Sequence, residues 1–470
     1  MLFCIGTGEP GAPAPAEGGG SVLRLLSNQN FNPTRLIVVS FGAIILLGTF
    51  LLHLPISARD GQFTPWLTCL FTATSATCVT GLVIHDTALF WSPFGQGVIL
   101  LLIQVGGMGV VTMAVAIFMF SGRKIGLKQR WVMQESISAP QVGGIVRMTG
   151  FILKTAFLIE AIGALLLALR FCPQFGLGKG IWYGIFHAVS AFCNAGFDLM
   201  GETGAFSSLT GYVGDPLVNL VICLLIVVGG LGFLTWHDVA AHGRHVSQYR
   251  LQSKLILLTT LALLVGGFLF FRFYEFSRPQ WAALTGGERG LAALFQSVSP
   301  RTAGFNTVDL TQLSACSQLM TILLMLAGGS PGSTAGGFKT TTLAVLLLSV
   351  GAVIRRQGSA RCFGRRLPDQ VLRNACAIFL LYLVLFLAGG MLICCMDEIP
   401  LMQALFEAAS AIGTVGLSLG ATAEASEASR LILIFLMYFG RVGGLTMIYA
   451  MAAGSNGSSS QYPQEQVTVG

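Results

Sequence analysis

The sequence has few charged residues. Asp, Glu, Lys and Arg together make up 10% of its 470 residues, whereas hydrophobic residues make up 54%. Soluble domains carry about 25% charged residues, so a chain of this length and composition cannot cover a water-exposed surface. The composition therefore excludes an ordinary soluble protein and indicates one that lipid solvates over much of its length.

The sequence also lacks the motifs of metal sites and of common enzymes. Its 11 cysteines form no CxxC pair and no Cys/His cluster with zinc spacing, and they fit the role of small apolar side chains in a membrane interior. It has no HExxH, no GxSxG and no convergent His/Asp set. These absences argue against a membrane enzyme and predict that the chain itself binds no cofactor.

Eight apolar segments are long enough to cross a bilayer, which takes about 20 helical residues. They are residues 36–55, 95–120, 145–170, 213–237, 252–274, 314–350, 374–395 and 429–453. Shorter apolar segments near residues 65–76, 180–192, 289–300 and 400–412 each follow an odd-numbered span. Apolar segments of about 10–14 residues are usually buried or re-entrant. The sequence therefore predicts the order span, short helix, span, repeated four times.

A short motif recurs after each odd-numbered span. It begins with Phe, has Ser four residues later and ends in Gly, over residues 71–81, 186–196, 295–304 and 406–416. A second glycine pattern, GxxG, recurs in the even-numbered spans at residues 106–109, 229–232 and 440–443, and residues 328–331 depart from it. Self-similarity at a fixed period is the mark of a repeated structural unit.

These patterns predict an all-α integral membrane fold with eight spans and four re-entrant pore loops. Four span–pore helix–span repeats would surround one central ion pore with pseudo-fourfold symmetry. The expected parts are a disordered cytosolic tail (1–35), repeat 1 (36–122), repeat 2 (123–243), repeat 3 with a gate loop inside the membrane (244–353), repeat 4 (354–454) and a cytosolic C-terminal tail (455–470). No cleavable signal peptide is apparent at the N-terminus.

The distribution of Lys and Arg predicts the topology. If both termini are cytoplasmic, most of the 27 Lys and Arg residues face the cytosol, as the positive-inside rule expects for a multi-pass protein of the cell membrane. The net charge of +7 then reflects contact with anionic lipid of the bilayer. It requires no nucleic-acid partner.

The repeated loops predict an ion filter. Irregular backbone at membrane depth is tolerated where it lines a polar cavity, and rings of backbone carbonyls can replace the hydration shell of K+. Glycine permits the backbone angles that turn successive carbonyls inward. The predicted filter comprises each motif glycine and the two residues before it, namely Val79, Thr80, Gly81, Asn194, Ala195, Gly196, Thr302, Ala303, Gly304, Thr414, Val415 and Gly416.

The sixth span contains residues that cannot sustain a helix. These are Gly328, Gly329, Ser330, Pro331, Gly332, Gly336 and Gly337, and they are followed by Lys339. The segment should break below the filter. It is not a phosphate-binding loop, because Phe338 separates Gly337 from Lys339 and no strand precedes it.

Several charged or polar residues are expected at membrane depth, where such side chains are costly and often functional. Arg441 is expected under the filter, as an electrostatic barrier or as a group that holds the gate loop, whereas Lys339 is expected to extend toward the cytosol. His187 and Glu407 should make orienting hydrogen bonds, and Glu160 either does so or handles ions. The acids Asp86, Asp198 and Asp309 either concentrate cations at the outer mouth or are solvated loop charges.

These motifs resemble the Trk/Ktr/HKT superfamily of potassium transporters over nearly the whole chain from residue 36. The likeness is closest to Ktr-type membrane subunits of the B type, because the two extra N-terminal spans of Trk subunits are missing. The resemblance implies K+ uptake, a homodimer and a separate cytosolic ring of the RCK type that binds ATP or ADP. It also implies that residues 328–337 are the intramembrane gate, and the family has an Arg at the place of Arg441.

The alternatives lie inside and outside this superfamily. Plant relatives that transport sodium have Ser in the place of Gly81, so glycine here favours potassium. A sodium-selective member, or one with Na+ as coupling ion, nevertheless stays open. A secondary transporter for a small solute is disfavoured, because such folds usually have two repeats rather than four.

Overall fold

A computed structural model of the chain describes residues 33–110, 112, 113, 130, 132, 134, 144–444 and 446–448. It is mostly helical, and four segments share one order of elements: a long helix, a short helix, an extended loop and a further helix. The first comprises α2 (Pro33–His53), η1 (Pro55–Ser57), α3 (Trp66–Thr77), α4 (Thr87–Phe90) and α5 (Pro93–Met108). The second comprises α8 (Ile145–Phe175), α9 (Leu177–Phe192), η2 (Met200–Glu202), η3 (Thr210–Tyr212), α10 (Pro216–Gly230) and α11 (Phe233–His242).

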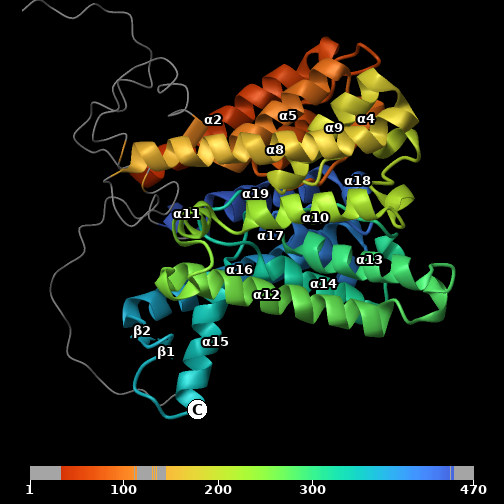
Figure 1. The fold of residues 1–470 in the computed structure, drawn as a ribbon. Helices are drawn as coiled ribbons and strands as arrows, with labels where there is room; N and C mark the ends of the chain where they lie inside the picture. The colour runs from red at the N-terminus through yellow and green to blue at the C-terminus, as the bar shows by residue number, and fades with distance from the viewer. Residues whose placement is uncertain are drawn as a thin grey trace, which may run out of the picture.

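The third segment carries an additional hairpin. Its helices are η4 (Val246–Gln248), α12 (Leu251–Phe270), η5 (Phe271–Glu275), η6 (Pro279–Trp281), α13 (Gly286–Val298), η7 (Ser299–Arg301), η8 (Leu310–Gln312), α14 (Ala315–Ala327) and α15 (Thr340–Ile354). The antiparallel strands β1 (Arg361–Cys362) and β2 (Arg365–Arg366) follow. The fourth segment comprises α16 (Asp369–Asp397), α17 (Leu401–Gly413), α18 (Ala421–Glu424) and α19 (Glu427–Val442). Figure 1 shows α15 running across the direction of α12, with the hairpin beside it.

The helices after the loops begin with the same type of cap. The side chains of Ser92, Asp215, Ser314 and Ser426 each accept a backbone N–H from the first turn of α5, α10, α14 and α19. Such a cap satisfies one of the N–H groups that a helix leaves unpaired at its start. Pro93 and Pro216 stand at the first helical position, where a missing N–H has no cost. Local sequence therefore sets where these helices begin.

The helices at the odd-numbered spans are long and continuous, whereas those at the fourth and sixth spans are bent or interrupted. Four helices are long and apolar enough to cross a membrane, over residues 34–53, 145–175, 251–275 and 369–397, and they match the four odd-numbered spans. The fourth predicted span is not one straight helix, since α10 and α11 are bent by 97° to each other. The sixth is interrupted between Ala327 and Thr340, so the predicted break is present. The second and the eighth extend beyond the described residues.

The core surrounds the four short helices. The motif residues Phe71, Phe186, Phe295 and Phe406 are all fully buried, and α3, α9, α13 and α17 correspond closely to the predicted short segments. The long helices instead expose large apolar side chains, such as Leu47, Leu165, Leu261 and Leu380, each at about 60% exposure. Extensive exposed apolar surface of this kind marks contact with lipid or another protein.

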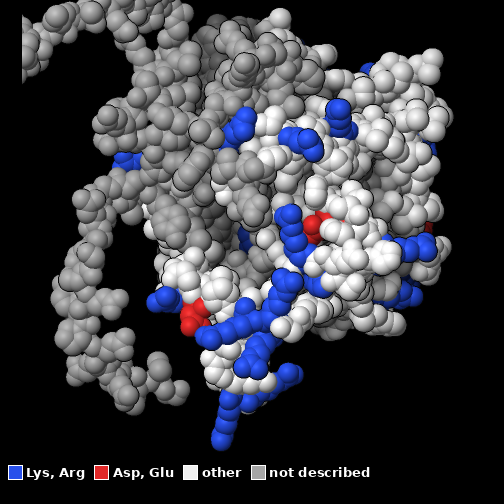
Figure 2. Space-filling model, turned by 60° about the vertical axis from the view of Figure 1, so that its left-hand side comes forward, with Lys and Arg blue, Asp and Glu red and all other residues white. Residues whose placement is uncertain are grey.

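Basic side chains gather at one region of the surface. Figure 2 shows Lys and Arg concentrated on the lower part of one face, with few acidic side chains among them. The β1–β2 hairpin contributes Arg361, Arg365 and Arg366, all of which are exposed. This region belongs to the stretch that the charge pattern assigns to the cytosol. That assignment remains a prediction.

Candidate ion site

The four motif glycines meet in a closed ring. A Cβ atom added to Gly81 would lie 2.4 Å from the carbonyl oxygen of Ala195, and one added to Gly196 would lie 2.6 Å from that of Ala303. A Cβ on Gly304 would lie 2.2 Å from the carbonyl oxygen of Val415. A Cβ on Gly416 would lie 2.1 Å from the carbonyl oxygen of Thr80, which belongs to the first motif and closes the ring. All four glycines have φ between 71° and 97°. Only glycine fits such positions, because a side chain would clash and would be strained.

The residues that precede the ring are themselves in an unusual conformation. Val79, Asn194 and Thr414 have φ of 56°, 59° and 51°, in the left-handed region. Residues other than glycine are uncommon there, and the β-branched Val79 and Thr414 are outliers. Thr302 is extended instead, with φ −174°, and its motif is one residue shorter than the other three. Strained backbone that the surrounding structure enforces is typical of functional sites.

The motif serines hold these loops in place. The carbonyl oxygens of Ser75, Ser190, Ser299 and Ser410 each accept a hydrogen bond from the residue before the ring glycine, at 2.7–2.8 Å. The hydroxyls of Ser75 and Ser410 accept from the N–H of Gly81 and Gly416, whereas those of Ser190 and Ser299 donate to the carbonyl after the glycine. Sequence reasoning gave these serines no role. The constant spacing of these serines from the motif Phe was the signal that could have identified their role in holding the loops.

His187 and Glu407 make the orienting hydrogen bonds that were predicted. The Nε2 atom of His187 accepts from Leu199 N at 3.3 Å, and its Nδ1 faces the carbonyl of Tyr183 at 2.7 Å. Glu407 accepts from Leu419 N at 3.0 Å and from two hydroxyl groups, those of Ser418 and Thr422. Both side chains therefore tie a short helix to the chain that leaves the ring.

A cavity of about 380 Å³ opens on one side of the ring. We call it the vestibule, and it is lined by all four ring glycines and by Asp86, Asp198, Asp309 and Glu424. The three predicted acids thus lie together here. Glu424 was not identified from the sequence, because no recurring motif marks its position after the fourth loop.

The vestibule acids differ in their environments. Asp86 caps α4 and accepts from Phe206 N at 2.8 Å. Burial raises the pKa of Asp198 to about 7. Burial also acts to raise the pKa of Asp309, but hydrogen bonds from Thr311 and Gln312 outweigh it and hold that pKa below its ordinary value. The vestibule therefore combines a carboxylate that stays ionised with one that titrates near neutral pH.

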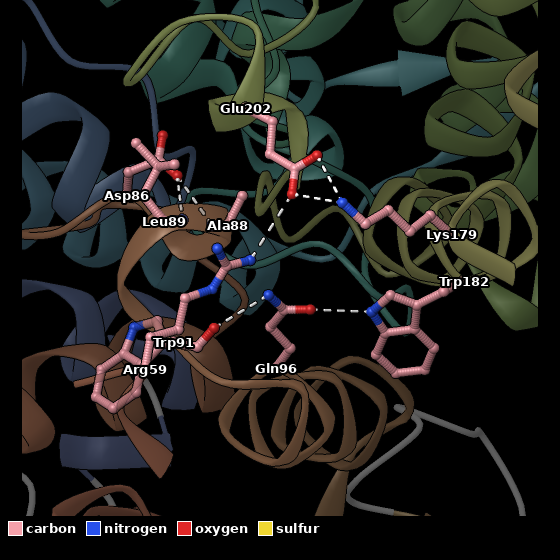
Figure 3. A network of polar contacts seen from close by, with 9 residues as sticks. All are labelled: Arg59, Asp86, Ala88, Leu89, Trp91, Gln96, Lys179, Trp182 and Glu202. Atoms are coloured by element: carbon pink, nitrogen blue, oxygen red, sulfur yellow. Dashed lines mark hydrogen bonds and ion pairs between the residues drawn. The ribbon is translucent and has the colours of Figure 1, made fainter. Parts of the chain in front are cut away.

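Polar contacts also join the first two segments of the chain. Figure 3 shows Glu202 between Lys179, at 3.0 Å, and Arg59, at 3.9 Å. In the same view Gln96 donates to the carbonyl of Trp91 and accepts from the indole N–H of Trp182. These contacts join α5 to α9.

The loop between α14 and α15, residues 328–339, lies against the ring loops. A Cβ on Gly336 would lie 2.1 Å from the hydroxyl of Thr414, and the amide of Asn194 donates to the hydroxyl of Thr334 at 2.9 Å. The backbone N–H of Ser330 donates to Gly230 O at 3.1 Å, and that of Gly337 donates to Gly440 O at 3.0 Å. The loop is therefore held between α10 and α19.

Two cations bind carbonyl groups of this loop. Arg441 donates to the carbonyls of Thr334, Gly106 and Gly107. The ammonium of Lys339 donates to Ala335 O at 2.9 Å and to Gly336 O at 3.1 Å. That this side of the loop faces the cytosol stays a prediction. The broken loop exposes carbonyl groups that a helix would have paired, and the lysine satisfies two of them.

A second cavity, of about 280 Å³, is lined by Pro331, Lys339 and Arg441 among others, and it shares no lining residue with the vestibule. Glu160 lines neither of these cavities. It accepts from the amide of Gln104 at 3.1 Å, which is the buried hydrogen bond that the sequence left as one option. In the described part of the chain, no three His, Cys, Asp or Glu side chains are grouped so that they could hold a metal ion.

Comparisons with known proteins all find similarity to cation transport proteins. A family model described as cation transport protein matches residues 27–462. The chain is 38% identical to the potassium/sodium uptake protein NtpJ of Enterococcus hirae, over 96% of this chain and 100% of that protein. It is 39% identical to the Ktr system potassium uptake protein B of Bacillus subtilis, over 94% and 97%. The crystal structure of the potassium transporter TrkH from Vibrio parahaemolyticus shares the fold, with TM-score 0.70 and 19% identity, over 90% of this chain and 85% of that one.

Proposed function

The chain belongs to the family of cation transport proteins, and from that premise we propose that it carries K+ into the cell through the glycine ring. The ring would act as the selectivity filter. Val79, Thr80, Gly81, Asn194, Ala195 and Gly196 would contribute its carbonyls from the first two loops, and Thr302, Ala303, Gly304, Thr414, Val415 and Gly416 from the others.

The observation that carries this proposal is the cyclic contact of the four glycines. A Cβ added to each would lie within 2.6 Å of the carbonyl oxygen that precedes the next glycine, so the four loops follow one another in a closed ring. Carbonyl oxygens in such an arrangement can replace the water around K+. The acids of the vestibule would raise the local concentration of cations before they enter.

The loop of residues 328–339 would be the gate. It lies against the ring loops and lines the second cavity, where Lys339 and Arg441 bind its carbonyls. A loop held by a few hydrogen bonds can move without unfolding the helices on either side. In this proposal the eight spans form four repeats around the pore, and both termini lie in the cytoplasm.

The proposed assembly follows the Ktr-like pattern of the sequence. We propose a homodimer in the cell membrane whose gate is controlled by a separate cytosolic subunit that binds nucleotide. A sodium-selective or sodium-coupled activity is the second candidate, favoured by the likeness to the potassium/sodium uptake protein of Enterococcus hirae. Gly81 favours potassium.

Ion flux in liposomes tests the proposal. The purified chain would be reconstituted and measured under opposing K+ and Na+ gradients, together with Gly81→Ser and with the control Gly61→Ser. Gly61 also has positive φ, 68°, but nothing lies within 4 Å of its missing side chain. K+-selective flux that is lost only in Gly81→Ser supports the filter, whereas Na+ flux alone, or selectivity that the ring variant leaves unchanged, contradicts it. A silent preparation is repeated with the cytosolic subunit added.

A further inference from the structure

A cavity of about 340 Å³ opens between the first two segments of the chain. It is lined by Arg59 from the loop after η1, by residues of α5 and α9, and by Glu202 of η2. It shares no lining residue with the vestibule. Its volume falls within the range of about 300–1,000 Å³ that is usual for small-ligand sites. The cavity is therefore large enough for a ligand of its own.

The charged side chains of this cavity are two cations and one carboxylate. Glu202 accepts two hydrogen bonds from the ammonium of Lys179, at 3.0 and 3.2 Å. The guanidinium of Arg59 lies 3.9 Å from the same carboxylate, too far for a hydrogen bond, so within the described residues its donors stay available (Figure 3). A planar guanidinium can bind a phosphate through two parallel hydrogen bonds. A group with one negative charge, such as a phosphodiester, would balance the excess positive charge.

Exposed apolar side chains continue from the cavity along both helices. On α9, Ile185 is 39% exposed and lies two turns beyond the lining residue Gly178, on the same face. On α5, Phe94 follows the lining residue Pro93 and shares a face with Leu101. Phe94 and Leu101 are 42% and 67% exposed. Apolar surface of this kind marks contact with lipid or another protein.

The aromatic side chains of the cavity are typical of the edge of a bilayer. Trp182 and Tyr183 line it, and the indole N–H of Trp182 donates to Gln96 at 3.0 Å. Trp and Tyr are enriched where lipid headgroups meet the hydrocarbon. A soluble phosphate compound would use the cations alone, whereas a phospholipid would also use the apolar faces. We propose that this cavity binds one anionic phospholipid of the phosphatidylglycerol class, with its phosphate on Arg59 and Lys179 and its acyl chains along α5 and α9.

The lipid would join parts of the chain that are separate in sequence. Arg59 belongs to the first segment, whereas Lys179 and Glu202 belong to α9 and η2 of the second. Gly201, beside Glu202, packs so closely on the carboxylate of Asp86 that a Cβ would clash with it. Asp86 lines the vestibule, so bound lipid would stabilise the loop next to this acid. Lipid binding can be measured without transport, so the proposal does not depend on which ion the protein carries.

Brominated lipid locates the site, because bromine on an acyl chain quenches the fluorescence of a tryptophan that it contacts. The full chain is reconstituted in phosphatidylcholine vesicles with a minor fraction of brominated phosphatidylglycerol, and in parallel vesicles with brominated phosphatidylcholine instead. Quenching should be greater with the brominated phosphatidylglycerol, and Trp182→Phe should remove this excess. Trp66→Phe is the control, since Trp66 is 47% exposed but does not line the cavity. Equal quenching by the two lipids, or an excess that Trp182→Phe leaves unchanged, overturns the proposal.

Charge variants separate binding in the cavity from a general attraction of anionic lipid. Arg59→Gln should raise the fraction of phosphatidylglycerol needed for half of the excess quenching about tenfold, a loss typical of hydrogen bonds to a charged group. Lys179→Gln should act in the same direction. Arg278→Gln is the matched control: its guanidinium lies 5.5 Å from the centre of the Tyr274 ring, outside this cavity, so the variant also removes a cation beside an aromatic ring. Wild-type titrations in both Arg59→Gln and Lys179→Gln overturn the proposal. Full reversal of the excess by soluble glycerol phosphate would assign the site to a free phosphate compound and overturn it as well.

Discussion

Arg441 donates a hydrogen bond to the carbonyl oxygen of Thr334, a residue 107 positions earlier in the chain. The same guanidinium bonds to the carbonyl oxygens of Gly106 and Gly107 at the end of α5. One charged group on α19 therefore joins the 328–339 loop to a helix of the first segment. Hydrogen bonds to charged groups contribute about 1.5–3 kcal/mol each, so this contact is strong enough to decide whether the loop stays in place.

We expect Arg441→Gln to open the loop. Loss of about 1–2 kcal/mol from the closed arrangement shifts the equilibrium by a factor of about 5–30 toward the open one. K+ flux into liposomes without any cytosolic subunit should rise accordingly.

Arg441→Lys is the informative control for that change. Lysine keeps the charge but cannot bind several carbonyls with one planar group, so an intermediate rise is expected. A fall in flux in both variants would contradict the role of Arg441 in holding the loop.

Gly416→Ala should abolish flux, whereas Gly420→Ala should not. Both glycines have φ 97°, so alanine is equally strained at each, by about 1–2 kcal/mol. The added Cβ would lie 2.1 Å from Thr80 O at Gly416 but meets nothing within 4 Å at Gly420. K+ flux per correctly folded protein should fall at least about tenfold in the first variant only. Equal losses in both variants would mean that strain, and not the ring contact, causes the effect.

K+ uptake at low K+ should increase between pH 6 and pH 8. The carboxyl of Asp198, with its pKa raised by burial from 3.8 to about 7, is mostly neutral at pH 6 and mostly ionised at pH 8. One added negative charge near the ions is worth about 1 kcal/mol at 4 Å in water, so a two- to fivefold rise is expected. Uptake measured in Asp198→Asn should stay at the low-pH level throughout.

Asp309→Asn provides the matched comparison. Its pKa is lowered, so the wild-type carboxylate is ionised at both pH values, and the variant should reduce uptake by a similar factor at each. The sign for stability is the opposite of that for transport. Between pH 4 and 7 the folded protein keeps the Asp198 proton that the unfolded chain has released, so the free energy of unfolding decreases as the pH rises through this window. A pH profile that Asp198→Asn leaves unchanged would contradict both statements.

Glu407→Gln should destabilise the fold. Its carboxylate accepts hydrogen bonds from Ser418, Leu419 and Thr422, and a glutamine amide group cannot accept them all. A buried donor left without a partner costs about 1–3 kcal/mol, so the melting temperature in detergent should drop by several degrees. Glu424→Gln, in the vestibule, should leave the melting temperature unchanged and lower uptake instead. A reversed pattern would show that Glu407 faces the ions.

Much of the fold could be predicted because the signals are local. The short helices were placed within a few residues, since an apolar run of limited length and the Phe, Ser and Gly spacing mark them. The break after Ala327 followed from glycines and a proline that a helix cannot hold. The 97° bend between α10 and α11 lies at the GxxG pattern of residues 229–232, which by sequence indicated only a repeat and not a bend. Its neighbour in space is the 328–339 loop, whose Gly332 O accepts from Phe233 N at 2.7 Å, and that contact joins residues about a hundred positions apart.

The sequence by itself determined that lipid surrounds this protein and that four glycines must adopt unusual backbone angles. Hydropathy, helix length and the conformational freedom of glycine are properties of short stretches of chain, so they can be inferred without knowledge of the fold. The tertiary structure decided which carbonyl each glycine meets, that the fourth contact returns to Thr80, and that Lys339 turns back onto its own loop. These outcomes depend on contacts between segments far apart in the chain, where packing and the need to pair every buried polar group select one arrangement.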